Sequence, residues 1–375
     1  MGRHLSSNRL RAAAALCAAI VWAAPAFGQV TPAAGYTPPD DTPSIKVGVT
    51  IFMDYTVQDS PKIKDSDGND VTLTSFNVGR SYINVTGNIN HLIAFRVTPD
   101  ITRESGTGSS LAGSYTFRLK YAYAQFNLDD WMTRGSWARF GQQQTPFIDY
   151  AEGIYRYRFQ GTIFPEREGY MSSADEGVSF HYNVPQNYGD VHAGYYNGEN
   201  YNKPEVNNEK SFQIRGTLRP LAQGDANLRG LRVTGFYNAD SYVKDGDRNR
   251  GIFEVSYEHK YLNAAYDYLA TSDQTSITKD KVDGHGWSTW LTPKYPLASR
   301  PGASIEALFR YDSYEPNKTL SDQKHKREIF GLAYWFPHQG NVSTALLFDY
   351  DNATFDNFVN QPMQRKYAVH GLINF

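Results

Sequence analysis

Alternation between apolar and polar side chains constrains this sequence more than any other feature. From Tyr367 to Phe375, an apolar or aromatic residue stands at every second position and a more polar row lies between. This is the period-two pattern of a β-strand whose two faces meet different environments. Sixteen segments of this kind fall between residues 45 and 375. The sequence therefore predicts an all-β fold.

The charged residues of these segments collect on one row of the alternation. In the fourth segment the predicted outward row is Tyr115, Phe117, Leu119, Tyr121 and Tyr123, opposite Arg118 and Lys120. A charge at mid-bilayer on a lipid-facing row would cost roughly 2–4 kcal/mol. The charged row would therefore line a water-filled lumen. A soluble sandwich shows the same alternation with the faces reversed, but the persistence of both rows favours a closed antiparallel transmembrane β-barrel of 16 strands.

The connections between segments support the same architecture. Long connections such as 58–73 alternate with tight turns such as 87–90, as outward loops and periplasmic turns do in outer-membrane barrels. An even strand number brings both ends of the barrel domain, residues 45–375, to one side. A terminal aromatic, Phe375, is typical of a strand that the barrel-assembly machinery recognises. No run of 18 uncharged apolar residues follows Gly28, so no membrane helix is predicted.

The first 28 residues have the pattern of a secretory signal peptide. Three arginines precede a short apolar run, and small residues lead to Gly28, after which we expect cleavage. A Pro-rich leader, residues 29–44, follows. Cleavage would remove Cys17, the only cysteine, which excludes disulfides and thiol catalysis in the mature chain. It would leave 34 Lys and Arg against 39 Asp and Glu, so a nucleic-acid partner is not expected.

The longest connection, residues 145–173, is unusually aromatic. Its aromatic residues are Phe147, Tyr150, Tyr155, Tyr157, Phe159, Phe164 and Tyr170. Solvated loops rarely carry so many rings, and the barrel interior offers a surface for them. We therefore predict that this third outward loop folds inward and narrows the pore. The alternative is an outward loop that caps a neighbouring subunit.

Several short motifs, in order along the chain, resemble the phosphate-selective porin O and P family. They are Gly141-Gln142-Gln143-Gln144-Thr145-Pro146-Phe147, Phe76-Asn77-Val78-Gly79-Arg80, Asp175-Glu176-Gly177-Val178, Leu228-Arg229-Gly230-Leu231-Arg232-Val233 and Tyr334-Trp335-Phe336. The resemblance implies an outer-membrane homotrimer of sixteen-stranded barrels, in which basic residues guide anions past an inward-folded loop. Here Gln144 stands where the family often has lysine, and the loop carries about as many acids as arginines.

Anion passage requires fixed positive charge in a narrow channel, where salt screens each charge less than in bulk water. The candidate anion-guiding residues are Arg80, Arg96, Arg118, Lys120, Arg139, Arg156, Arg158, Arg215, Arg219 and Arg310. The strand face that alternation assigns to Arg80 depends on the residue from which the alternation is counted. Counting from Phe76 places it toward lipid, and counting back from Ile83 places it toward the lumen, which the cost of a charge in lipid favours.

The alternative role for each candidate is a structural salt bridge in the barrel wall. Acids are available on the inward rows: Asp100, Glu254, Glu258, Asp267, Glu306, Asp312 and Asp349. Segments 91–103, 114–128 and 209–219 carry mainly bases inward, whereas 249–260, 261–272 and 302–315 carry acids. The sequence thus predicts a lumen that is basic on one wall and acidic on the other.

These patterns favour a porin for passive diffusion of small hydrophilic solutes, biased toward anions such as phosphate. The alternatives are a general non-selective porin and, in a different class, a plugged structural or adhesive barrel. No catalytic residue, metal site or cofactor is expected. The histidines lack metal-ligand spacing, and no Ser–His arrangement of the hydrolase type is evident. The expected partners are outer-membrane lipid and small polar solutes.

Overall fold

The computed structural model describes residues 39–106, 108–320, 322–337 and 342–375. The predicted signal peptide, 1–28, and most of the predicted leader, 29–44, lie outside this part. The elements are β1 (Ser44–Lys64), β2 (Asp70–Asn88), β3 (Ile93–Arg103), β4 (Tyr115–Asn127), β5 (Trp137–Gln144), α2 (Ile148–Tyr155), α3 (Phe164–Arg167), β6 (Ala174–Val184), the 3-10 turn η2 (Pro185–Asn187), β7 (Gly189–Tyr196), β8 (Ser211–Leu218), β9 (Leu231–Ala239), β10 (Ser241–Val243), β11 (Gly246–His259), β12 (Leu262–Asp273), β13 (Val282–Pro296), β14 (Ser304–Glu315), β15 (Lys324–Trp335), β16 (Ser343–Asp356) and β17 (Gln364–Asn374).

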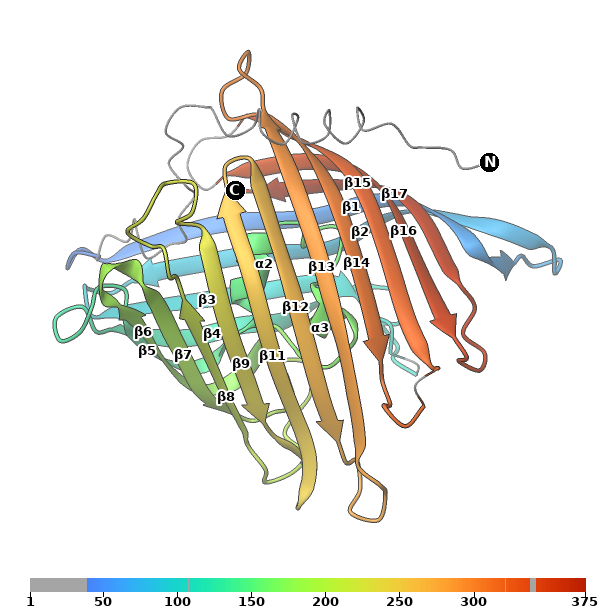
Figure 1. The fold of residues 1–375 in the computed structure, drawn as a ribbon, viewed down its shortest axis with the longest axis horizontal. Coiled ribbons are helices and arrows are strands. Elements are labelled where there is room, and N and C mark those ends of the chain that lie inside the picture. Colours follow the sequence, from blue (N-terminus) through green and yellow to red (C-terminus); the bar gives the residue numbers. More distant parts are fainter. Residues whose placement is uncertain (1–38, 107, 321, 338–341) are drawn as a thin grey trace, which may run out of the picture.

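The strands form one closed antiparallel barrel (Figure 1). Each long strand pairs with its neighbours in the chain, and β1 closes the ring by pairing with both β2 and β17. The short β10 lies in the connection from β9 to β11 and pairs only with β11. Across the described residues, sixteen strands therefore make the wall, as predicted. We call the side with the long connections the loop end and the other side the turn end.

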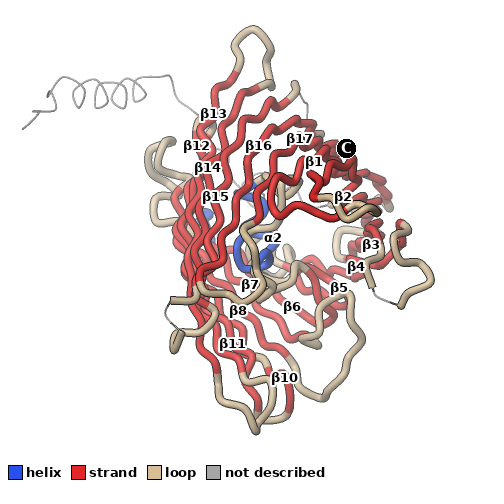
Figure 2. The backbone as a smooth tube through the Cα atoms, turned by 90° about the vertical axis from the view of Figure 1, so that its right-hand side faces the viewer, coloured by secondary structure: helices blue, strands red, loops and turns tan. Residues whose placement is uncertain are grey.

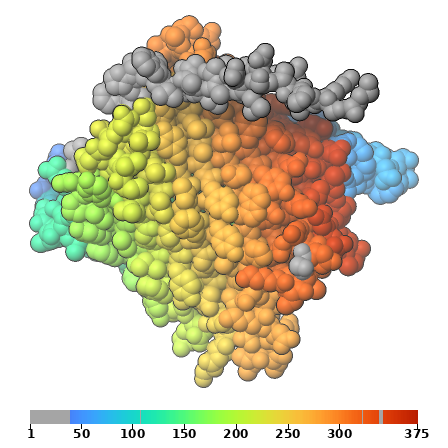
Figure 3. Space-filling model, viewed as in Figure 1, coloured from blue at the N-terminus to red at the C-terminus, as the bar shows by residue number. Residues whose placement is uncertain are grey.

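The exterior of the wall is apolar, and the interior is polar. On β8, Phe212 and Leu218 are exposed at 43% and 55%, whereas Gln213 and Arg215 on the opposite face are buried. The outer face in Figure 3 is a continuous surface over the later strands. This arrangement fits a wall surrounded by lipid hydrocarbon, in which the backbone polar groups must form their hydrogen bonds within the sheet. None of the helices in the described ranges is long and apolar enough to span a membrane.

Two β-bulges determine whether nearby side chains face the lipid or the lumen, which simple alternation does not settle at these positions. Phe52 pairs with Arg80 and the next residue, Met53, pairs with Val78, so Gly79 is an extra residue. This bulge explains why counting from Phe76 and from Ile83 gives opposite faces for Arg80. Arg80 lies on the lumen side, as the cost of a charge in lipid predicted.

The second bulge overturns part of the predicted outward row of β4. Thr98 pairs with Tyr121 and Pro99 pairs with Leu119, so Lys120 is the extra residue. Proline has no N–H to donate to the ladder, which makes Pro99 a natural site for this irregularity. After the bulge the faces exchange. Tyr121 and Tyr123 therefore point into the lumen, and their predicted outward orientation is wrong.

The first outward loop is shorter than predicted. Residues 58–73 were expected to form a loop, but β1 continues to Lys64 and β2 begins at Asp70. The resulting hairpin extends beyond the rest of the wall in Figure 1. Asp65 closes its tip by accepting backbone hydrogen bonds from Asp67 and Asn69, at 3.0 and 2.9 Å. Residues 65–69, with the sequence Asp-Ser-Asp-Gly-Asn, thus form a turn stabilised by a side chain.

The third outward loop enters the barrel, as predicted. Figure 2 shows α2 inside the ring of strands. Phe147, Ile148, Ile154 and Tyr155 are at most 1% exposed, in a chain whose outer surface is rich in apolar side chains. The aromatic residues of this loop therefore form the apolar core of the barrel interior. We call residues 145–173 the constriction loop.

Candidate functional site

The constriction loop is packed against one wall of the barrel. Tyr155 meets Trp290 of β13 with ring centroids 5.1 Å apart, and Tyr157 meets Trp335 of β15 at 5.8 Å, both edge to face. Phe164 contacts Tyr314 of β14 in the same way at 6.1 Å. Such pairs add about 0.5–1.5 kcal/mol each beyond the area they bury. The loop is therefore held on the side formed by the later strands.

Hydrogen bonds fix the loop to the same wall. The polar ties are Tyr150 to Thr234 at 2.9 Å, Asn263 Nδ2 to the Ile154 carbonyl at 2.9 Å, Tyr157 Oη to Glu306 at 3.1 Å, Gln160 Nε2 to Asp349 at 2.8 Å, Arg310 to the Thr162 carbonyl at 2.8 Å, and His325 to Glu168 at 2.7 Å. The partners come from β9, β12, β14, β15 and β16. These hydrogen bonds are made at α2, between α2 and α3, and just after α3, so the loop has little freedom to move.

This packing hides the acidic wall from the water in the lumen. Glu254, Asp267, Glu306 and Asp312 are each 2% exposed, and Asp349 is 1% exposed. The acids predicted from the sequence are thus present where expected. The loop, together with neighbouring side chains, covers them.

The opposite wall, formed by β2 to β5, carries a row of cations that we call the basic row. Its members are Arg80, Arg118, Lys120, Arg96 and Arg139, in order from the loop end to the turn end. The order follows from strand pairing, since Arg118 is level with Asp100, Tyr123 with Arg96, and Gln125 with Arg139. The row spans most of the length of β4.

At the loop end of this row, Arg80 and Arg118 both pair with one carboxylate, that of Asp100. Asp100 Oδ2 lies 2.6 Å from an Arg80 nitrogen and 2.9 Å from Arg118 Nε. Asp100 is fully buried, whereas the Arg80 and Arg118 side chains are 25% and 29% exposed. Two guanidiniums around one carboxylate leave a net positive charge that faces the lumen.

The other three members have no ion-pair partner within the described residues. Arg96 bonds Asn84 and Thr98 at 2.8 and 2.9 Å and lies over Tyr121. Lys120 Nζ lies 4.9 Å from the centre of the Tyr82 ring. Arg139 likewise contacts only neutral groups. Rings and amides position these cations without cancelling their charge.

The constriction loop presents Arg158 toward this row. Arg158 Nε forms an ion pair with Glu152 at 2.6 Å, and its field acts on Arg80 and Lys120. Burial raises the pKa of Glu152 to about 7, an effect that the Arg158 guanidinium opposes. Arg156 has other neighbours, because it lies over Trp335 at 4.3 Å and 3.6 Å from Glu306.

The remaining predicted cations form salt bridges within the wall. Arg215 and Arg219 share Asp190 of β7, and Arg310 binds Asp312 through two hydrogen bonds of 2.9 and 2.7 Å. Segment 209–219 therefore contributes less free charge to the basic wall than expected, while β2 and β5 contribute more. The anion-guiding role of the ten predicted residues stays a prediction.

Two residues of the site were missed by the sequence analysis. Tyr201, in the outward connection 197–210, reaches the loop end of the basic row, with its ring 5.0 Å from the Arg118 guanidinium and its hydroxyl 3.4 Å from Asp100. Asp149, in the first turn of α2, is exposed to the lumen. Neither belongs to a strand, so alternation could not indicate its direction.

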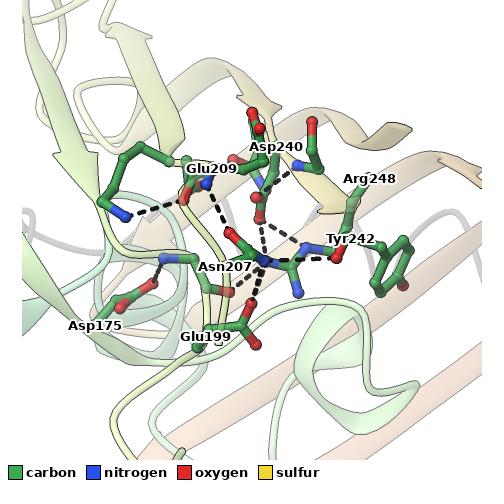
Figure 4. A network of polar contacts seen from close by, with 12 residues as sticks. Asp175, Glu199, Asn207, Glu209, Asp240, Tyr242 and Arg248 are labelled. Carbon is green, nitrogen blue, oxygen red and sulfur yellow. Dashed lines mark hydrogen bonds and ion pairs between the residues drawn. The ribbon is translucent and has the colours of Figure 1, made fainter. Parts of the chain in front are cut away.

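A polar network at the loop end holds the connection 197–210 in place (Figure 4). Arg248 pairs with Asp240 at 2.7 Å, and Asn207 donates to Glu199 at 3.1 Å. The Gly198 amide donates to Asp175 at 3.0 Å. Tyr201 is thus presented by a structured loop. In the described ranges, no group of three or more His, Cys, Asp or Glu is arranged to hold a metal ion.

Known porins share this fold. An anion-selective porin from Comamonas acidovorans is 10% identical, with 89% of this chain and 100% of that chain covered and a TM-score of 0.59. The trimer form of OmpT from Vibrio cholerae is 12% identical, with 89% and 100% covered and a TM-score of 0.55. The outer membrane channel DcaP of Acinetobacter baumannii is 10% identical, with 89% and 97% covered and a TM-score of 0.54.

No curated protein sequence matches the chain significantly. The family description "Phosphate-selective porin O and P" does match, over residues 45–290, which is more than half of the chain. That match covers β1 to β12 and most of β13, including the whole basic row and the constriction loop. The chain therefore belongs to the phosphate-selective porin O and P family, and it is an outer-membrane channel rather than an enzyme.

Proposed function

We propose that this porin passes small anions, inorganic phosphate among them, in preference to cations. One observation carries the proposal: the constriction loop covers the acidic wall, whereas Arg80, Arg118, Arg96 and Arg139 of the basic row stay partly exposed and only Lys120, at 5%, is buried. A permeating ion therefore meets the charge of β2 to β5, although the lumen as a whole contains charges of both signs. The porin from Comamonas acidovorans that shares this fold is anion-selective, which agrees with this assignment.

The basic row suits anions in both charge and geometry. A charge about 4 Å from a passing ion contributes about 1 kcal/mol even in bulk water, and more where the channel is narrow. Because the cations follow one another along β4, a permeating anion can contact the next cation before it leaves the previous one. This favours passage over trapping. Partly exposed guanidiniums such as Arg80 and Arg118 can also donate two hydrogen bonds to one phosphate.

Reversal potentials in a KCl gradient test the proposal. The wild-type porin in a planar bilayer should prefer chloride over potassium, and phosphate should reduce the chloride current. The double variant Arg96→Gln/Lys120→Gln leaves no carboxylate unpaired, so it should lower the chloride preference roughly two- to five-fold through lost charge alone. Lys64→Gln, at the exposed hairpin tip, is the matched control.

Three outcomes would contradict the proposal. A preference for potassium would support a general or cation-preferring porin instead. Absence of conductance would support a plugged structural barrel. An unchanged selectivity in the double variant would remove Arg96 and Lys120 from the mechanism.

We also propose that residues 1–28 are removed during export and that the mature chain forms a homotrimer. The pattern of the first 28 residues supports the first point, and the trimer form of Vibrio cholerae OmpT supports the second. Phe375 would be the signal for barrel assembly. Mass spectrometry of the purified protein, followed by cross-linking in detergent, tests cleavage and trimer formation.

A further inference from the structure

A recess of about 460 Å³ opens from the lumen between the constriction loop and the wall from β4 to β8. It lies toward the turn end, beyond Lys120 on the basic row. Its lining includes Arg139 from the wall and Asp149 from the loop. The recess is large enough for a small organic solute and lies beside the proposed anion route.

Arg139 is held in a fixed orientation on one side of this recess. Its guanidinium lies 3.7 Å from the centre of the Trp137 ring. Gln125 and Gln144 accept its hydrogen bonds at 2.8 and 3.0 Å. These contacts position the cation but leave its charge uncompensated, so it can bind a carboxylate.

Asp149 stands on the other side of the recess. Its side chain is exposed, and it has no hydrogen bond or ion pair within the described part of the chain. The other acid of the lining, Asp190, is different, because Arg215, Arg219 and His181 surround it. Among the described residues, the recess thus presents Arg139 and Asp149, which form no ion pair, along with a cluster in which Arg215 and Arg219 share the one carboxylate of Asp190 and keep a net positive charge.

We propose that this recess binds small zwitterions that carry a carboxylate and an ammonium group, such as free amino acids. The carboxylate would pair with Arg139 and the ammonium with Asp149. A phosphate dianion gains the first contact but is repelled by Asp149, whereas a simple cation gains only the second. The inference builds on the proposed function, since the solute reaches the recess along the same lumen.

Liposome swelling with two isomeric solutes tests the inference. L-Alanine is a zwitterion and lactamide is its neutral isomer, so their permeation rates differ through charge rather than size. In wild-type liposomes alanine should permeate faster than lactamide. Asp149→Asn and Arg139→Gln should each lower the alanine-to-lactamide ratio roughly fivefold, as loss of a contact of about 1 kcal/mol implies. Asp280→Asn, on an exposed outward loop, should leave the ratio unchanged.

Reversal potentials of the same variants separate this inference from the proposed function. Asp149→Asn should raise the chloride preference, and Arg139→Gln should lower it, although both lower the alanine ratio. A wild-type ratio of one, or a ratio that Asp149→Asn does not change, would overturn the zwitterion site. A wild type that prefers potassium but still favours alanine would overturn the anion route and leave the recess assignment standing.

Discussion

Side-chain direction in this barrel follows from alternation until a bulge interrupts it. Alternation correctly places Arg215 and Arg310 inward, because β8 and β14 pair without a shift in that region. It fails for Tyr121 and Tyr123, because the extra residue at Lys120 exchanges the faces of β4. Pro99 on the partner strand is the only local hint of this bulge. A bulge belongs to a pair of strands, so one strand's sequence cannot fix it.

Individual charges in the constriction loop differ in what they face, and this gives a prediction for a single residue. Arg158 interacts electrostatically with Arg80 and Lys120 of the basic row, whereas Arg156 lies against Glu306 and Trp335. Arg158→Ala removes this cation and takes away the ion-pair partner that Glu152 and Glu166 share, at 2.6 and 4.0 Å. It should therefore lower the chloride preference roughly two- to five-fold, as measured by the reversal potential in a KCl gradient.

Arg156→Ala is the matched control for that prediction, since it removes the same charge from the same loop. Its effect on the reversal potential should be clearly smaller. Equal effects of the two substitutions would mean that the loop acts through its total charge rather than through the position of Arg158.

At the level of elements, the sequence predicts the strands and the constriction loop well but not the second loop at the pore. The seven aromatic residues of 145–173 need a surface to pack on, and the barrel interior supplies one. The connection 197–210 carries no comparable signal. Tyr201 reaches the lumen because Arg248, Asp240 and Glu199 fold that connection across the loop end. Those contacts join distant parts of the chain and leave no local pattern.

The constriction loop should make ion selectivity depend on pH through Glu152. Its pKa is raised to about 7, mainly by burial, with Glu166 raising it further and Arg158 and Lys120 lowering it. Below that pH the carboxyl becomes neutral, so less of the Arg158 charge is balanced, and Glu166 at 4.0 Å is its remaining acidic partner. The chloride preference should therefore increase as the pH falls from about 8.5 to about 5.5, a range that brackets the pKa of this carboxyl.

Glu152→Gln separates this effect from the histidines of the lumen. The variant is neutral at every pH, so its chloride preference should be high throughout and nearly independent of pH. If the variant keeps the wild-type pH dependence, another group is responsible and Glu152 has no part in it.

In the proposed mechanism, selectivity comes from the covering of one wall, which is a property of the whole molecule and of no single strand. The sequence correctly predicts bases on some strands and acids on others. It cannot show that the acids lie beneath the constriction loop, because that depends on which wall the loop packs against. Trp290, Trp335 and Glu306 decide this by their contacts with Tyr155 and Tyr157. Total charge, which is mildly acidic, therefore says little about which ions pass.

Selection by a long row of cations should weaken as salt screens it. The Debye length is about 10 Å at 0.1 M salt and about 3 Å at 1 M. At low salt an ion in the lumen interacts with several members of the basic row at once, whereas at high salt it interacts only with the nearest. With a constant concentration ratio across the bilayer, the chloride preference should fall steadily as both KCl concentrations are raised toward about 1 M. A preference that does not change with salt would point to one tight contact site in place of the extended row, and Arg96→Gln/Lys120→Gln would then retain the wild-type selectivity at every concentration.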